Sequence, residues 1–157
     1  MGRRLTTRLQ TASLLSTLFQ RTVEVRVRDD VSAATGAIAT YRESDGRLSG
    51  AMWASVDFTI ASAAALCLLS DEHMEEARNE SDYLPQRWHE HFAEIANICA
   101  RFFGALEAPR VALDSVWIAP TAPPTALMDE MEDLLQHRVF DVNLGNYGKG
   151  QLHLVAL

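Results

Sequence analysis

The chain has 157 residues, 48% of them hydrophobic, and a formal net charge of −7. This length is enough for one compact domain and too short for two, so we predict a single domain over residues 1–157. No apolar run approaches the roughly 20 residues of a membrane span, and polar residues interrupt the N-terminal stretch where a signal peptide would lie. We therefore expect a cytoplasmic protein.

Charge is spread unevenly along the chain. Residues 1–28 hold six arginines and one acidic residue, whereas residues 29–157 hold eight basic and twenty acidic residues. Because the whole chain is acidic, we expect neither nucleic acid nor a membrane as a partner. Cys67 and Cys99 fall in apolar helical segments, where cysteine acts as a small hydrophobe in a reducing compartment.

The first half of the chain predicts helices and strands in one run. Apolar side chains share one helical face over 3–20, and valines alternate with charged residues over 23–28. Asp45-Gly46 is a turn signal between two further strands. In chain order, the predicted elements are a helix at 3–20, strands at 23–28, 34–42 and 47–57, a helix at 58–70, and an acidic connection with some helical character at 71–83.

The second half continues this pattern around a long helix. Its predicted elements are a helix at 85–104, a strand at 111–119, a proline-rich turn at 120–125, a helix at 126–136, and strands at 138–144 and 151–157 around a glycine-rich turn. The whole pattern predicts an α+β fold, with one largely antiparallel sheet and the long helices at 3–20, 58–70 and 85–104 packed on one face. The sequence shows no internal repeat.

The helix at 85–104 carries the most informative motif, Glu94-Ile95-Ala96-Asn97-Ile98-Cys99-Ala100. Its apolar residues recur at intervals of three or four, as in a buried stripe: Trp88, Phe92, Ile95, Cys99, Phe102 and Leu106. Its polar residues follow the same rhythm on another face: Glu90, Glu94, Asn97 and Arg101. Glu76 and Asn79 repeat the Glu/Asn spacing in an acid-rich segment, so spacing alone does not distinguish a site from a solvated face.

Residues Glu94 to Ala100 resemble the helix motif of the CheC/CheX/FliY chemotaxis phosphatases, in which Glu-(Ile/Leu)-x-Asn is followed by small and apolar residues. The Ser49-Gly50-Ala51-Met52-Trp53 strand before an Ala-rich helix is similar to the family pattern, as is the order of elements from about residue 5 to the end. Residues 3–20 contain neither an acid nor an asparagine, so the resemblance is to the single-site, CheX-like branch. Arg101 departs from the glycine that is common in the family.

The resemblance implies a CheC/CheX-like fold and a phosphatase that acts on the aspartyl phosphate of a response-regulator receiver domain. It makes Glu94 and Asn97 the catalytic residues: Asn97 orients the attacking water, and Glu94 pairs with a lysine of the receiver. Glu90 and Arg101 are the candidate partner-binding residues. No cofactor is expected on this chain, because the receiver itself holds the divalent metal. We also expect a homodimer, as in members of the CheX-like branch.

Two other functions are consistent with the same residues. One is a non-catalytic signalling module on this scaffold, in which Arg101 blocks the chemistry while the helix docks on a receiver or a flagellar-switch-type partner. The other is an unrelated small α+β domain with a structural or ligand-binding role. A metal site is not expected, because His89 and His91 are two residues apart and point roughly 200° apart around a helix.

Overall fold

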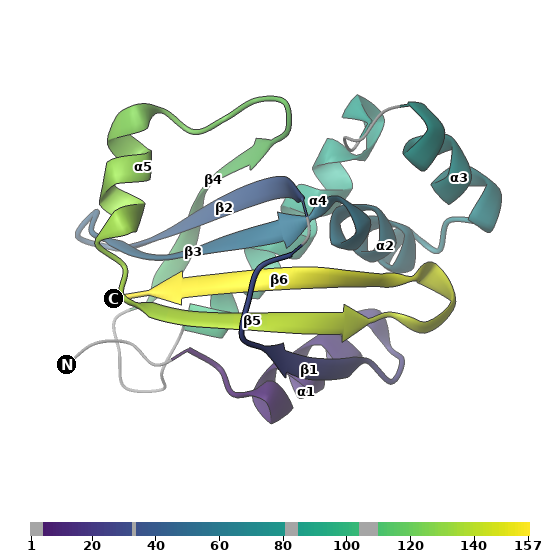
Figure 1. Ribbon diagram of the computed structural model, residues 1–157, viewed down its shortest axis with the longest axis horizontal. Coiled ribbons are helices and arrows are strands. Elements are labelled where there is room, and N and C mark those ends of the chain that lie inside the picture. Colours follow the sequence, from purple (N-terminus) through teal and green to yellow (C-terminus); the bar gives the residue numbers. More distant parts are fainter. Residues whose placement is uncertain (1–4, 33, 81–84, 104–109) are drawn as a thin grey trace.

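A computed structural model of the protein describes residues 5–32, 34–80, 85–103 and 110–157. It shows a six-stranded sheet in the order β1-β5-β6-β3-β2-β4, in which all neighbouring strands are antiparallel (Figure 1). The strands are β1 Glu24–Arg28, β2 Thr35–Glu43, β3 Leu48–Ser55, β4 Val111–Ile118, β5 Gln136–Asn143 and β6 Lys149–Ala156. The predicted α+β fold with an antiparallel sheet is confirmed.

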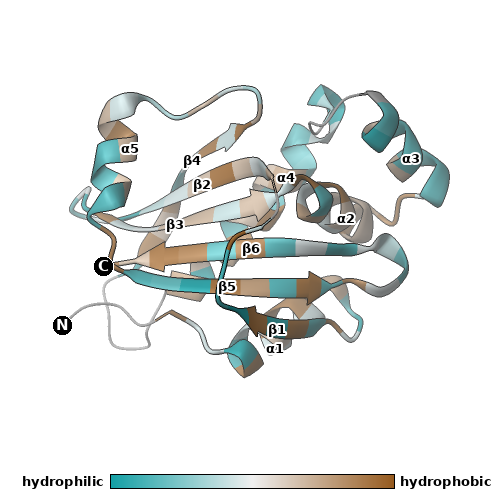
Figure 2. Ribbon diagram, viewed as in Figure 1, coloured by the Kyte–Doolittle hydropathy of each residue, from teal (hydrophilic) through white to brown (hydrophobic). Residues whose placement is uncertain are grey.

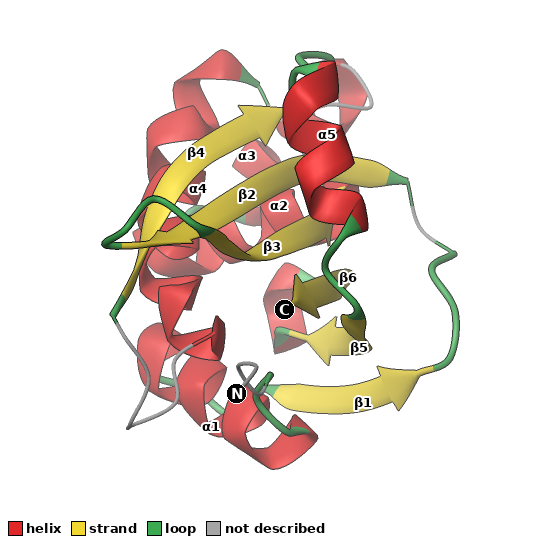
Figure 3. Cartoon of the chain, turned by 90° about the vertical axis from the view of Figure 1, so that its left-hand side faces the viewer, coloured by secondary structure: helices red, strands yellow, loops and turns green. Residues whose placement is uncertain are grey.

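Helices cover both faces of this sheet unequally (Figures 1 and 3). The helices are α1 Arg8–Phe19, α2 Val56–Cys67, α3 Asp71–Glu80, α4 His89–Ile98 and α5 Thr125–Glu132. The main core lies between the sheet and the side of α1, α2 and α4, and it contains the largest buried side chains, among them Phe58, Phe92, Phe103 and Phe140. A smaller cluster around Leu127 and Met131 packs α5 on the opposite face. In the described parts of the chain, no helix has the length and apolar character to cross a membrane.

Capping side chains explain where two helices begin. The side chains and backbone groups of Thr7 and Gln10 bond reciprocally, so α1 starts at Arg8 and residues 5–7 are not helical. The predicted start at residue 3 lies outside the described residues. The Ser55 hydroxyl accepts a hydrogen bond from the Phe58 backbone, so α2 starts at Val56, before the predicted position 58.

The predicted helix at 85–104 is three helical pieces in succession. The 3-10 turn Gln86–Trp88 leads into α4, and the 3-10 segment Cys99–Phe103 follows it; the last predicted residue, 104, lies outside the described residues. The acidic connection is α3, which appears largely hydrophilic in Figure 2, and predicted residues 81–83 are not described. The helix predicted at 126–136 is α5, which is shorter than predicted. It ends at Glu132, and the strand β5 already begins at Gln136.

The strand order contains a repeat that the sequence does not show. Each of two units consists of a helix, a strand and a hairpin: α1-β1-β2-β3 and α4-β4-β5-β6. The third strands, β3 and β6, pair at the centre, and the first strand of each unit lies beside the hairpin of the other. The helices α1 and α4 therefore hold corresponding places in the two units.

Candidate functional site

The predicted site lies on and just after α4, a helix that buries one face in the main core. Trp88, Phe92 and Ile95 are buried, whereas the predicted site residues on the other face are all exposed: Glu90, Glu94, Asn97 and Arg101. Glu94 and Asn97 are separated by about 60° around the helix axis, so their side chains are neighbours. Neither side chain makes a hydrogen bond or ion pair with any residue that the structure describes.

A buried tyrosine fixes the end of α4. The Tyr41 hydroxyl, on β2, donates a hydrogen bond of 2.7 Å to the carbonyl oxygen of Ala96, one residue before Asn97. Burial raises the pKa of Tyr41 well above its ordinary value of 10.0, so this hydroxyl stays protonated. Sequence reasoning missed Tyr41, although a tyrosine at an inward-facing strand position is a signal that its hydroxyl needs a partner.

The segment that follows α4 packs closely on the sheet. The Phe103 ring packs on the Tyr41 ring, with 4.6 Å between their centroids. A Cβ added at Gly50 on β3 would lie 2.4 Å from a carbon of the Phe103 ring, so only glycine fits there. The Ser49-Gly50-Ala51 stretch thus lets the segment after α4 pack directly on the sheet.

Two grooves flank α4 and leave Glu94 and Asn97 on the ridge between them. A groove of about 480 Å³ lies towards α1, and Arg101 is the only charged side chain among the described residues that line it. A second groove, of about 500 Å³, lies towards β4 and includes Glu90 in its lining. Neither Glu94 nor Asn97 lines these grooves. The Glu/Asn pair therefore lies on exposed surface outside both grooves.

The second Glu/Asn pair of the chain lies in a different setting. Glu76 and Asn79 are exposed on α3, whose only buried side chains among those described are Met74 and Ala77. The Glu76 carboxylate lies 3.7 Å from the Arg87 guanidinium and so has a partner within the chain. The Tyr41 hydroxyl holds the backbone of α4, but no hydrogen bond of this kind between described residues holds the backbone of α3.

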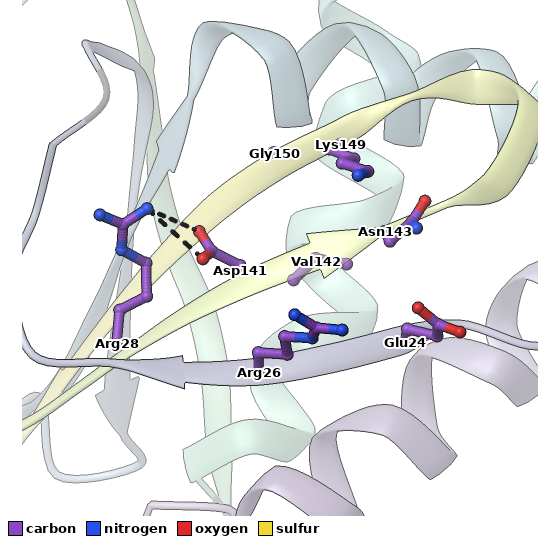
Figure 4. A pocket seen from close by; sticks show the side chains of 8 residues that line it. All are labelled: Glu24, Arg26, Arg28, Asp141, Val142, Asn143, Lys149 and Gly150. Carbon is purple, nitrogen blue, oxygen red and sulfur yellow. Dashed lines mark hydrogen bonds and ion pairs between the residues drawn. The ribbon is translucent and has the colours of Figure 1, made fainter.

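A pocket of about 360 Å³ lies on the other face of the sheet, over β1, β5 and β6 (Figure 4). Val25 points into the helical core, so its strand neighbours Arg26 and Arg28 point away from it. Arg28 is paired with Asp141 at 3.3 Å and with Asp30 at 3.2 Å. Because this pocket lies on the face of the sheet away from α4, we assign none of the predicted chemistry to it.

The described residues contain no cluster of three or more His, Cys, Asp or Glu side chains that could hold a metal ion. Nδ1 of His137 lies 3.0 Å from Nε2 of His153, and the His153 ring stacks on Trp53. Burial and the neighbouring His137 lower the pKa of His153 below its ordinary value of 6.5.

Comparison with known proteins defines the fold class. No model of a protein family matches the sequence, and a search of curated proteins finds no match either. The FliM middle domain from H. pylori matches with a TM-score of 0.53 and 10% identity, over 95% of this chain and 84% of that chain. FliY from Thermotoga maritima matches with a TM-score of 0.53 and 14% identity, over 92% of this chain and 81% of that chain.

A chain of the FliG–FliM complex from H. pylori also matches, with a TM-score of 0.56 and 10% identity, over 95% of this chain and 85% of that chain. The protein therefore has the fold of the FliM middle domain and FliY, and it resembles the CheC/CheX/FliY family in structure as well as in its helix motif. At these identities the likeness concerns the fold.

Proposed function

We propose that the protein is a phosphatase that removes the phosphoryl group from the aspartyl phosphate of a response-regulator receiver domain. The observation that carries this proposal is the exposed pair of Glu94 and Asn97, without partners among the described residues, on a helix that Tyr41 and the core hold in place. A functional group must be accessible to its substrate and fixed in direction, and this pair satisfies both conditions.

Asn97 would contribute to the reaction by orienting a water molecule. The water oxygen bonds to phosphorus as the bond from phosphorus to the receiver's aspartate oxygen breaks, and the water proton leaves with inorganic phosphate or solvent. The carboxamide oxygen of Asn97 can accept a hydrogen bond from this water, while its amino group donates to a phosphoryl oxygen. Positioning of this kind is the main contribution of a protein to phosphoryl transfer, and the receiver's own divalent ion neutralises the phosphoryl charge.

Glu94 would hold the two proteins in register. Its carboxylate has no cation to pair with among the described residues, so an approaching receiver finds it available. Burying such a charge at an interface is costly unless a partner cation meets it. A lysine on the receiver would meet this requirement and would fix Asn97 over the phosphoryl group.

A docking module is the second candidate function, and Arg101 favours it. The exposed guanidinium lies four residues after Asn97, in the 3-10 segment that follows α4, where it can restrict the approach of a phosphoryl group. Solved structures of similar fold include FliM in complexes with SpeE and with FliG. On this alternative, α4 binds a receiver or a switch-type partner without dephosphorylating it.

A dephosphorylation assay separates the two candidates. A panel of receiver domains would be phosphorylated with a small-molecule phosphodonor, and the loss of aspartyl phosphate would be followed with and without the protein. We expect at least one receiver to lose phosphate faster with the protein, and Asn97→Ala to abolish this effect. A receiver that binds with unchanged phosphate lifetime would establish the docking module instead.

A further inference from the structure

The two edges of the sheet differ in how well they resist pairing with another strand. The edge strand β1 has five residues and carries three charges, at Glu24, Arg26 and Arg28. The opposite edge strand, β4, has eight residues and a single charge, Asp114, which is paired with Arg42 at 3.1 Å. Charged side chains protect an edge strand from additional pairing, so β4 is the less protected edge.

The outer side of β4 has no partner strand in the described part of the chain. β4 pairs only with β2, and the backbone hydrogen bond that its outer side makes to a described residue is a local one, in which the Thr121 amide donates to the Ile118 carbonyl oxygen at 3.0 Å. The register shifts at Thr40/Tyr41 so that Asp114 is an extra residue in β4, which interrupts its regular edge. The uninterrupted edge is therefore the four-residue stretch 115–118.

This stretch runs along the second groove beside α4, with β4 as the outermost strand (Figure 3). Val116, Trp117 and Ile118 line the groove from the strand, and Glu90 and Ala93 line it from the helix. A free strand edge with a helix beside it is an arrangement in which extended peptides bind by adding a strand.

The groove also indicates the charge of its occupant. The Glu90 carboxylate is exposed and forms no ion pair with a described residue, and the chain as a whole carries a charge of −7. Side chains of an added strand alternate between the two faces of the sheet, so every second one would face α4. Apolar side chains fit beside Ala93 and Val116, and a basic one fits opposite Glu90.

We propose that the edge at 115–118 binds an extended, apolar and basic segment of a partner protein, which adds a seventh strand to the sheet in the groove between α4 and β4. This docking site is separate from Glu94 and Asn97 and does not depend on phosphatase activity. Backbone hydrogen bonds from the strand edge would supply affinity, and the groove with Glu90 would select the side chains.

Two synthetic peptides test this site. The basic probe is an acetylated, amidated heptamer of sequence Thr-Val-Thr-Lys-Thr-Val-Thr, whose valines and lysine share one face; the control peptide has glutamate in place of the lysine. Hydrogen exchange of the protein, followed by NMR, would be measured with each peptide. We expect the basic peptide to slow exchange of the outward-facing amides within 115–118, and the control peptide to leave them unchanged.

Variants distinguish this site from general charge attraction. Glu90→Lys should weaken binding of the basic peptide by about tenfold or more, whereas Glu75→Lys on α3, which makes the same change in net charge, should leave it within about twofold. Both positions are exposed, so both variants should fold. The proposal is overturned if the basic peptide does not bind, protects β1 instead of β4, or binds without protecting β4. Protection that grows with protein concentration alone would also overturn it, because a second copy would then be the occupant.

Discussion

The helices α3 and α4 carry the same Glu-x-x-Asn spacing in opposite surroundings. On α3, Glu76 already pairs with Arg87, and the helix buries few side chains. On α4, Glu94 and Asn97 have no partner among the described residues, and the helix is fixed by its buried stripe. The two helices therefore differ in how firmly their backbone is held and in whether the polar side chains of the pair remain available, and the proposed function depends on both properties.

Asn97→Ala and Asn79→Ala give the sharpest test of this difference. We expect Asn97→Ala to lower the dephosphorylation rate of the cognate receiver by roughly 10²-fold, with little change in affinity, because the lost hydrogen bond strengthens only in the transition state. Asn79→Ala should leave both the rate and the affinity unchanged. Single-turnover loss of aspartyl phosphate at saturating protein measures the effect.

The comparison breaks if the two asparagine variants behave alike. Equal losses of the dephosphorylation rate would show that the rate does not depend specifically on the Glu/Asn pair of α4. Full activity of Asn97→Ala on a receiver that the parent protein dephosphorylates would make the catalytic assignment wrong while leaving the fold as described.

Glu94→Ala should weaken receiver binding, and Glu76→Ala should not. Removing one partner of a salt bridge at an interface that excludes water commonly costs about 2 kcal/mol or more, which is roughly a thirtyfold loss of affinity. The Glu76 carboxylate is satisfied within the chain, so its removal leaves the interface intact. Calorimetric titration with the receiver measures both, and an equal loss for the two variants would contradict the assignment of the interface to α4.

Tyr41→Phe should remove the anchor that distinguishes α4 from α3. The substitution keeps the ring against Phe103 but leaves the Ala96 carbonyl oxygen without its buried donor, at a cost of about 1–3 kcal/mol in the free energy of unfolding. Amides of α4 should exchange faster, while those of α3 should not change. Urea denaturation and hydrogen exchange check these effects, and an unchanged exchange rate in α4 would show that the core alone fixes the helix.

Arg101→Ala has the smallest expected effect. Arg101 lines the groove towards α1 and is exposed, so we expect it to attract the anionic phosphorylated receiver without closing the path to Asn97. Affinity should fall a few-fold at low ionic strength, and the difference should shrink as salt screens the charge. A faster dephosphorylation by the variant would show instead that the guanidinium obstructs the reaction.

The elements of the fold could be predicted from local patterns, because each strand or helix has its own periodicity. The Asp45-Gly46 turn, the alternating valines of β1 and the buried stripe of α4 are examples of such local signals. Helix starts were less accurate at α1 and α2. The Thr7 cap begins α1 after the apolar periodicity has already started, and the Ser55 cap begins α2 at Val56, inside the predicted strand at 47–57.

Strand order and supporting contacts could not be predicted in the same way. β1 pairs with β5, more than 100 residues later, and no local signal specifies such a partner. The bond from Tyr41 to Ala96 joins residues 55 apart, and it depends on that long-range packing. A family motif and its surroundings in the sequence predict Glu94 and Asn97, whereas their position between two grooves depends on how α1, α4 and β4 pack together.

The most direct measurement of the central claim is an NMR titration of the protein with a receiver domain that carries an unhydrolysable phosphoryl analogue. The account predicts that backbone shifts change at Glu90, Glu94 and Asn97 on α4 and at Arg101 in the 3-10 segment that follows it, and that α3 with Glu76 and Asn79 is unaffected. Shift changes centred on α3, or spread over the surface without a maximum on α4, would contradict the claim that this helix is the functional surface.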